Sequence, residues 1–149
     1  MLAHALKRFA IKLFNFVFLS NHGHLLLQAP EGMLPHFMQF LLGNVARKLG
    51  TLHDWHDKFW GRRYSAEAVL DDDAVNGRMI YIFQHGVKEG LVEHHGTWPG
   101  LKALPQLLGQ PQASFNWPIL AGQNEAAVPW ELQGAATLTL SPLPCLSST

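Results

Sequence analysis

The chain has 149 residues, with eleven basic and eleven acidic side chains, so its formal net charge at neutral pH is zero. Apolar residues make up 48% of it and charged residues 15%, a balance that excludes a disordered chain and favours one folded domain. No apolar run reaches the roughly 20 residues of a membrane span, so we expect no membrane partner. The single cysteine, Cys145, excludes an intrachain disulfide and a cysteine-built metal site, and indicates a reducing, cytoplasmic compartment.

The zero net charge hides an uneven distribution of charge along the chain. Residues 1–70 carry eight basic and four acidic side chains, a net +4, whereas residues 71–149 carry three and seven, a net −4. A neutral protein with such a division can still present a basic face. The zero net charge therefore does not exclude a nucleic-acid partner.

Hydrophobic periodicity in the first part of the chain predicts two helices and a pair of strands. Residues 2–13 have apolar side chains at helical spacing, which is typical of an amphipathic helix. Residues 14–19 are apolar on nearly both faces, which favours a strand buried on both sides. Residues 22–27 either continue this strand or form its antiparallel partner. A second helix is expected over residues 34–49, with Gly50 as its stop signal.

Further along, residues 65–70 are predicted as a short strand. Three consecutive aspartates, Asp71 to Asp73, then open a third helix that runs to about Lys88, because acidic side chains favour the positive end of a helix. Residues 103–149 contain no Lys or Arg and show no persistent helical or strand period. We therefore predict that a folded domain spans residues 1–102 and that a weakly ordered tail follows it.

Two histidines separated by one residue, His22 and His24, are the first candidates for chemistry. On a strand, residues i and i+2 point to the same face, so the two imidazoles would lie close together and make half of a metal site. The spacing leaves open an alternative, in which both are partly buried or loop histidines without a ligand.

The predicted third helix carries the second set of candidates. Tyr81, Gln84 and His85 share one helix face, because residues three and four apart are neighbours on a helix surface. A tyrosine can act as a nucleophile where a metal or a base favours its phenolate, and Gln84 or His85 could reach the same metal. The apolar residues around Tyr81 leave open that it is simply a core residue.

The connection over residues 59–64 interleaves aromatic residues with arginines. Trp60 could stack on a base while Arg62 and Arg63 pair with phosphates. A packed surface loop with arginines at its rim is the alternative interpretation.

Four segments carry a resemblance to a known family: FVFLSNHGHLLL, FLLGNVARKLG, FWGRRYSAEAVLDDDA and YIFQHGVKEGLVEHHGTWPG. In order and spacing they resemble the tyrosine-dependent single-strand transposases of the HUH superfamily, in particular the REP-associated tyrosine transposases of bacteria. The resemblance covers residues 3–103. It implies an α+β fold in which helices pack on an antiparallel sheet, the ferredoxin-like arrangement of that superfamily. Because Met1 stands where the first helix begins, the strand that precedes this helix in the family is expected to be missing.

The resemblance also implies a chemistry. His22 and His24 match the histidine pair that holds a divalent metal. Tyr81 matches the nucleophile that cuts single-stranded DNA and becomes linked to its 5′ phosphate. His85 takes the place of the third metal ligand, where Asn is usual in this group. The metal implied is Mg²⁺ or Mn²⁺, with Zn²⁺ as an alternative that three imidazoles favour.

The partner that the resemblance implies is single-stranded or hairpin DNA, which Trp60, Arg62 and Arg63 are expected to contact. The setting would be the nucleoid of a bacterial cytoplasm, and a homodimer is compatible with it. The expected activity is metal-dependent nicking and joining of single-stranded DNA through a 5′-phosphotyrosine intermediate. The alternative is an inactive remnant of a transposase that still binds single-stranded or hairpin DNA.

Overall fold

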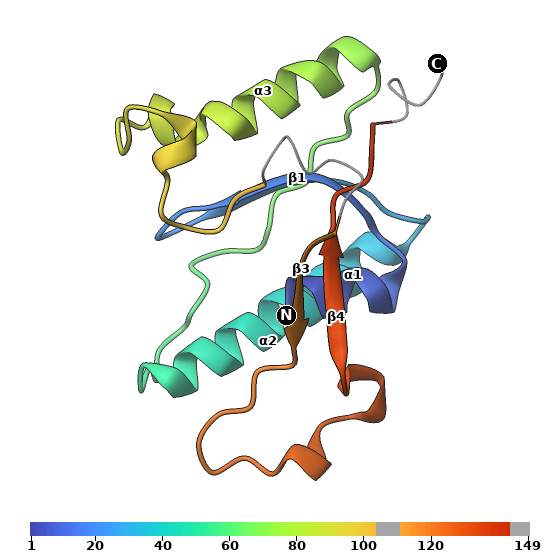
Figure 1. Cartoon of the computed structure of the whole chain (residues 1–149), viewed down its shortest axis with the longest axis vertical. Helices are drawn as coiled ribbons and strands as arrows, with labels where there is room; N and C mark the ends of the chain where they lie inside the picture. The colour runs from blue at the N-terminus through green and yellow to red at the C-terminus, as the bar shows by residue number, and fades with distance from the viewer. Residues whose placement is uncertain (104–110, 144–149) are drawn as a thin grey trace. The chain divides into compact units, whose positions relative to one another are not determined.

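The computed structural model describes residues 1–103 and 111–143, and Cys145 lies outside them. The described chain is α+β, as predicted, with three α-helices, a β-hairpin and a second two-stranded sheet (Figure 1). It divides into two compact units, each assembled from separate stretches of sequence. Residues 1–11, 29–66 and 112–138 form the first unit, and residues 12–28, 67–111 and those from 139 on form the second. Within the described ranges, no helix combines the length and the apolar character needed to cross a membrane.

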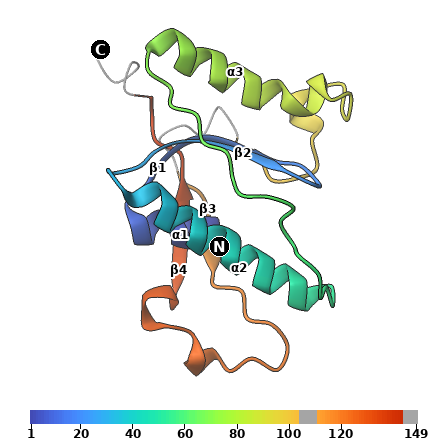
Figure 2. The ribbon, with the colours of Figure 1, turned by 180° about the vertical axis from the view of Figure 1, so that it is seen from behind.

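The second unit is a β-hairpin covered by a helix. Strand β1 (Lys12–Phe18) pairs antiparallel with β2 (Gly23–Gln28), and helix α3 (Asp72–Lys88) packs against this hairpin (Figures 1 and 2). Burying one large apolar side chain contributes roughly 1.5–3 kcal/mol, so a shared core holds the helix on the strands. The buried side chains of this core are Phe14, Val17, Leu26, Met79, Ile82 and Leu143.

Strand β1 is buried along most of its length, as its apolar sequence predicts. One of its edges pairs with β2. On the other edge, the amide of Phe18 donates to the carbonyl of Leu101 at 2.8 Å, and the amide of Ala103 donates to the carbonyl of Phe16 at 2.9 Å. The strand therefore has neighbours on both edges, although the second neighbour forms only an isolated bridge at Lys102.

Helix α3 begins and ends where the sequence predicts. The side chain of Asp71 accepts a hydrogen bond from the amide of Ala74 at 2.7 Å, which satisfies one of the free amides of the first turn. Asp72 and Asp73 occupy that turn, at the positive end of the helix dipole. Past the other end, Gly90 has a φ of 67°, a left-handed conformation that glycine adopts readily.

The first unit packs helix α1 (Leu2–Phe9) on helix α2 (Met33–Leu52), and Figure 2 shows the two side by side. Aromatic rings form this contact. The ring of Phe9 meets those of Phe37 and Phe40 edge-on, with centroids 6.2 and 5.6 Å apart. Such pairs add about 0.5–1.5 kcal/mol to the burial of their area, so they fix the crossing of the two helices.

Both helices of the first unit differ from prediction at their carboxyl ends. The first ends at Phe9, four residues early, because Ala10 adopts a left-handed φ of 51° and the chain then becomes strand β1. The second passes through Gly50 and ends at Leu52, so that glycine is not its stop signal. A residue with a left-handed backbone conformation comes only after the helix, at Asp54, where φ is 52°.

The strand predicted over residues 65–70 is absent from the structure. A strand needs a neighbour to take its backbone hydrogen bonds. The strands of the described chain pair as β1 with β2, and as β3 (Pro111–Asn116) with β4 (Ala135–Thr139). Most side chains of residues 65–70 are exposed, so the segment also lacks a core to pack on.

The segment after residue 102, predicted to be weakly ordered, contains two strands in its described part. Strands β3 (Pro111–Asn116) and β4 (Ala135–Thr139) pair in a second sheet. Along β4, buried residues alternate with exposed ones, and Ala136 and Leu138 are the buried ones. This period of two is the ordinary signal of a half-buried strand. The domain limit at residue 102 stays a prediction.

Candidate metal and nucleophile site

Three histidines of the second unit converge where the β-hairpin turns. The amide of Leu19 donates to the carbonyl of His22 at 2.8 Å, which closes a tight turn between β1 and β2. This turn places His22 just before β2 and His24 within it. As the spacing predicts, the two imidazoles lie together, with ring centroids 5.2 Å apart. The third imidazole, His85, comes from the last part of α3.

The Nε2 atoms of the three rings face one another. Those of His22 and His24 lie 2.8 and 3.2 Å from that of His85. All three ligand atoms lie within 4.8 Å of one another. Two nitrogens bound to one ion at about 2.0–2.1 Å stand roughly 3.0–3.4 Å apart, and the two distances to His85 are close to that spacing. The three imidazoles could therefore hold a divalent metal ion.

The protonation of these rings suits metal binding. His22 Nδ1 lies 2.7 Å from the side-chain oxygen of Asn21, so Nδ1 donates and the Nε2 lone pair faces the cluster. Burial lowers the pKa of His24 and of His85, and the neighbouring histidines lower both pKa values further. Both rings are therefore neutral at pH 7, and neutral imidazole is the form that binds a metal.

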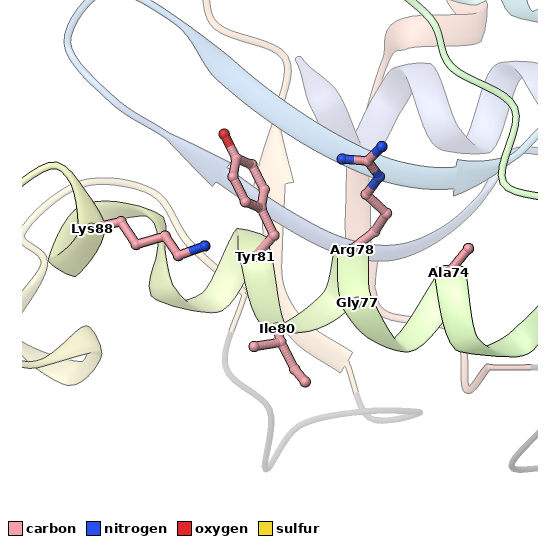
Figure 3. A pocket seen from close by; sticks show the side chains of 6 residues that line it. All are labelled: Ala74, Gly77, Arg78, Ile80, Tyr81 and Lys88. Atoms are coloured by element: carbon pink, nitrogen blue, oxygen red, sulfur yellow. The ribbon is translucent and has the colours of Figure 1, made fainter.

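Tyr81 lies beside this cluster, one helical turn before His85. Its ring centroid is 5.4 Å from that of His24 and 5.0 Å from that of His85. The ring is half-buried and packs on the core at one side. Figure 3 shows it rising from α3 on the side of the hairpin. Gln84, the other metal-ligand candidate on this helix, is exposed and stands outside the three-histidine cluster.

A buried asparagine joins β1 to the helix that carries Tyr81. Asn15 is fully buried, and its Nδ2 donates to the carbonyl of Met79 at 3.1 Å, two residues before Tyr81. Its Oδ1 is buried without a hydrogen-bond partner in the described part of the chain. The pairing of β1 with β2 is irregular between Leu13 and Asn15. The prediction missed this residue, although it interrupts an otherwise apolar run.

The three residues expected to contact DNA lie in the first unit. The indole nitrogen of Trp60 donates to the carbonyl of Leu42 in α2 at 2.9 Å, so this ring is anchored and half-buried. Arg62 and Arg63 are exposed. The structure thus gathers the three histidines and Tyr81 in one unit. The DNA contacts expected of Trp60, Arg62 and Arg63 stay a prediction.

A family model described as "Transposase IS200 like" matches residues 1–85, more than half of the chain. The chain belongs to the IS200-like transposase family. The matched region contains the hairpin with its two histidines and reaches through Tyr81 to His85. It confirms the transposase resemblance of the sequence, and it makes DNA the partner class of this IS200-like transposase. Searches of curated proteins and of solved structures gave no match.

Proposed function

We propose that this IS200-like transposase nicks and rejoins single-stranded DNA through a covalent bond between Tyr81 and a 5′ phosphate. One observation carries the proposal. The ring of Tyr81 stands 5.4 and 5.0 Å from the rings of His24 and His85, whose Nε2 atoms converge with that of His22. A nucleophile and a set of metal ligands therefore lie side by side in one compact unit.

The bonds in this reaction balance without a nucleotide cofactor. In nicking, the Tyr81 oxygen loses its proton and bonds to phosphorus, and the bond between phosphorus and the 3′ oxygen breaks. The 3′ oxygen takes up a proton as it leaves, and the downstream strand stays attached to Tyr81 through its 5′ phosphate. In joining, a 3′ hydroxyl loses its proton and bonds to phosphorus, the bond between phosphorus and the Tyr81 oxygen breaks, and the Tyr81 oxygen takes up a proton.

The donor set fits a divalent ion. Three imidazole nitrogens suit Mn²⁺ or Zn²⁺ better than Mg²⁺, which prefers oxygen ligands. When bound, such an ion would polarise the scissile phosphate and offset the charge that develops on its oxygens. The protein holds His22, His24 and His85 with their Nε2 atoms toward one point, and it fixes the Tyr81 ring against His24.

The test uses a hairpin oligonucleotide with randomised single-stranded flanks and a fluorescent label at its 3′ end. The label then stays on the fragment that joins the protein. With Mn²⁺, the wild-type chain should give a labelled protein band on a denaturing gel, and Tyr81→Phe should give none. Tyr64→Phe is the matched control, because the chain has two tyrosines, and it should keep the band.

A band that persists in Tyr81→Phe would overturn the role given to Tyr81. Binding of the oligonucleotide without any adduct in Mn²⁺, Zn²⁺ or Mg²⁺ would instead favour the inactive DNA-binding alternative.

A further inference from the structure

The face of α3 that carries Tyr81 continues as a shallow hollow of about 370 Å³. Most of the residues that line it recur at helical spacing on one side of the helix. They are Ala74, Gly77, Arg78, Ile80, Tyr81 and Lys88, which are labelled in Figure 3. Two of the six are cations, one on each side of Tyr81 along the helix.

Both cations are exposed and close to the nucleophile. Lys88 Nζ lies 5.1 Å from the centroid of the Tyr81 ring. Arg78 stands one turn before Tyr81, and its Nη2 donates to Glu67 Oε1 at 2.5 Å. This ion pair orients the guanidinium, and because the Arg78 side chain is 44% exposed, its other N–H groups can reach a ligand. In Figure 3 the ammonium end of Lys88 reaches toward Tyr81.

Small residues leave the helix face open just before Arg78. A Cβ added at Gly77 would meet nothing within 4 Å, and Ala74 offers a single methyl group. A glycine inside a helix lowers the stability of that helix by about 1 kcal/mol relative to alanine. Alanine would fit at position 77 without a clash. An open helix face next to two cations, beside a nucleophile for phosphate, suits an extended chain of phosphates.

We propose that Arg78 and Lys88 bind the phosphates on the two sides of the one that Tyr81 attacks, so that a single DNA strand lies along α3. The inference rests on the proposed function of Tyr81. The two cations stand on opposite sides of Tyr81 along the helix. Arg78 comes one turn before Tyr81, and the Lys88 side chain reaches back from two turns after it, so that its Nζ lies 5.1 Å from the ring centroid.

Salt dependence of binding tests the phosphate contacts. The labelled hairpin pool is titrated by fluorescence anisotropy, in the Tyr81→Phe background so that no strand is cut. Each contact to a single-strand phosphate contributes about 0.7 to the slope of log K against log salt. Arg78→Met and Lys88→Met should each reduce the magnitude of this slope by about 0.7, and the double variant by about 1.4. Lys88→Arg should restore it.

The matched control is Lys12→Met, which removes an exposed lysine of the same unit from β1 rather than from α3. The salt slope of Lys12→Met in the Tyr81→Phe background should equal that of Tyr81→Phe alone. An equal reduction in Lys12→Met would show that net charge alone governs the slope, and it would overturn the assignment.

Adduct formation separates this inference from the proposed function. With Tyr81 present, Lys88→Met should raise the DNA concentration for half-maximal adduct formation more than it lowers the maximal rate, because the contact exists before the reaction begins. Unchanged slopes with an intact wild-type adduct would overturn the phosphate contacts and leave the Tyr81 chemistry standing. Reduced slopes without any wild-type adduct would keep the contacts and overturn that chemistry.

Discussion

Replacing Asn15 by leucine should weaken metal binding without destabilising the fold. Asn15 is the buried side chain that ties β1 to α3, through its hydrogen bond to the Met79 carbonyl. Two of the metal ligands come from the hairpin and one, His85, from α3. A looser α3 would therefore let His85 drift from the other two ligands.

The stability terms of this substitution oppose each other. Losing the 3.1 Å hydrogen bond costs about 1 kcal/mol. Removing the unpartnered Oδ1 of Asn15 from the core recovers a penalty of the same order, about 1–3 kcal/mol. The free energy of unfolding should therefore stay the same or rise by up to about 2 kcal/mol. Metal affinity should fall by up to about tenfold, the lower end of the loss when a direct hydrogen-bond partner of a metal ligand is removed, because Asn15 acts on His85 only through α3.

Isothermal titration with Mn²⁺ measures the affinity, and urea denaturation measures the stability. Asn44→Leu is the matched control, because Asn44 is also buried and donates to a helix carbonyl, that of Phe40, in the unit that lacks the three-histidine cluster. Its metal affinity should equal that of the wild type. An Asn15→Leu variant that binds Mn²⁺ as tightly as the wild type would refute the reasoning, as would an equal loss in Asn44→Leu.

Three further predictions concern stability, pH and metal. Gly23→Ala should lower the free energy of unfolding by about 1 kcal/mol, since a Cβ there would overlap the Phe18 ring of β1. Gly77→Ala should raise the free energy of unfolding by up to about 1 kcal/mol. Urea midpoints in the opposite order would contradict this. Burial is the first cause that holds the pKa values of His4, His24 and His85 below the usual 6.5. The folded chain thus binds fewer protons than the unfolded chain below about pH 6.5. Its stability without metal should therefore hold above pH 6.5 and decrease below it. Equal urea midpoints at about pH 7.5 and pH 5 would disprove this. EDTA should abolish adduct formation and added Mn²⁺ should restore it, as the denaturing gel would report.

The parts of the site that could be predicted are those that local periodicity determines. His22 and His24 share a face because strand residues alternate, and Tyr81 and His85 share one because helix residues recur at every turn. Periodicity could not show that this hairpin and this helix meet, because they are far apart in sequence. That expectation came from the family resemblance. The partner of Asn15, a carbonyl in α3, is a tertiary contact that no local pattern predicts.

The errors in the predicted fold also come from tertiary contacts that local patterns do not show. Gly50 is a reasonable stop signal on propensity, but the packing of α2 outweighs the roughly 1 kcal/mol that a helical glycine costs. The strand predicted over residues 65–70 has no partner in the described chain, and a strand exists only with a partner. Strand β4 was detectable from its alternation, and the high content of proline, glutamine and alanine around it concealed that signal.

The most direct test of the central claim is to identify the residue that carries the DNA. The adduct formed by the wild-type chain is digested with nuclease and protease, and the remaining nucleotide is located by tandem mass spectrometry. A nucleotide 5′-phosphate on Tyr81 is the predicted result. A nucleotide on Tyr64 or on any other side chain would contradict the account.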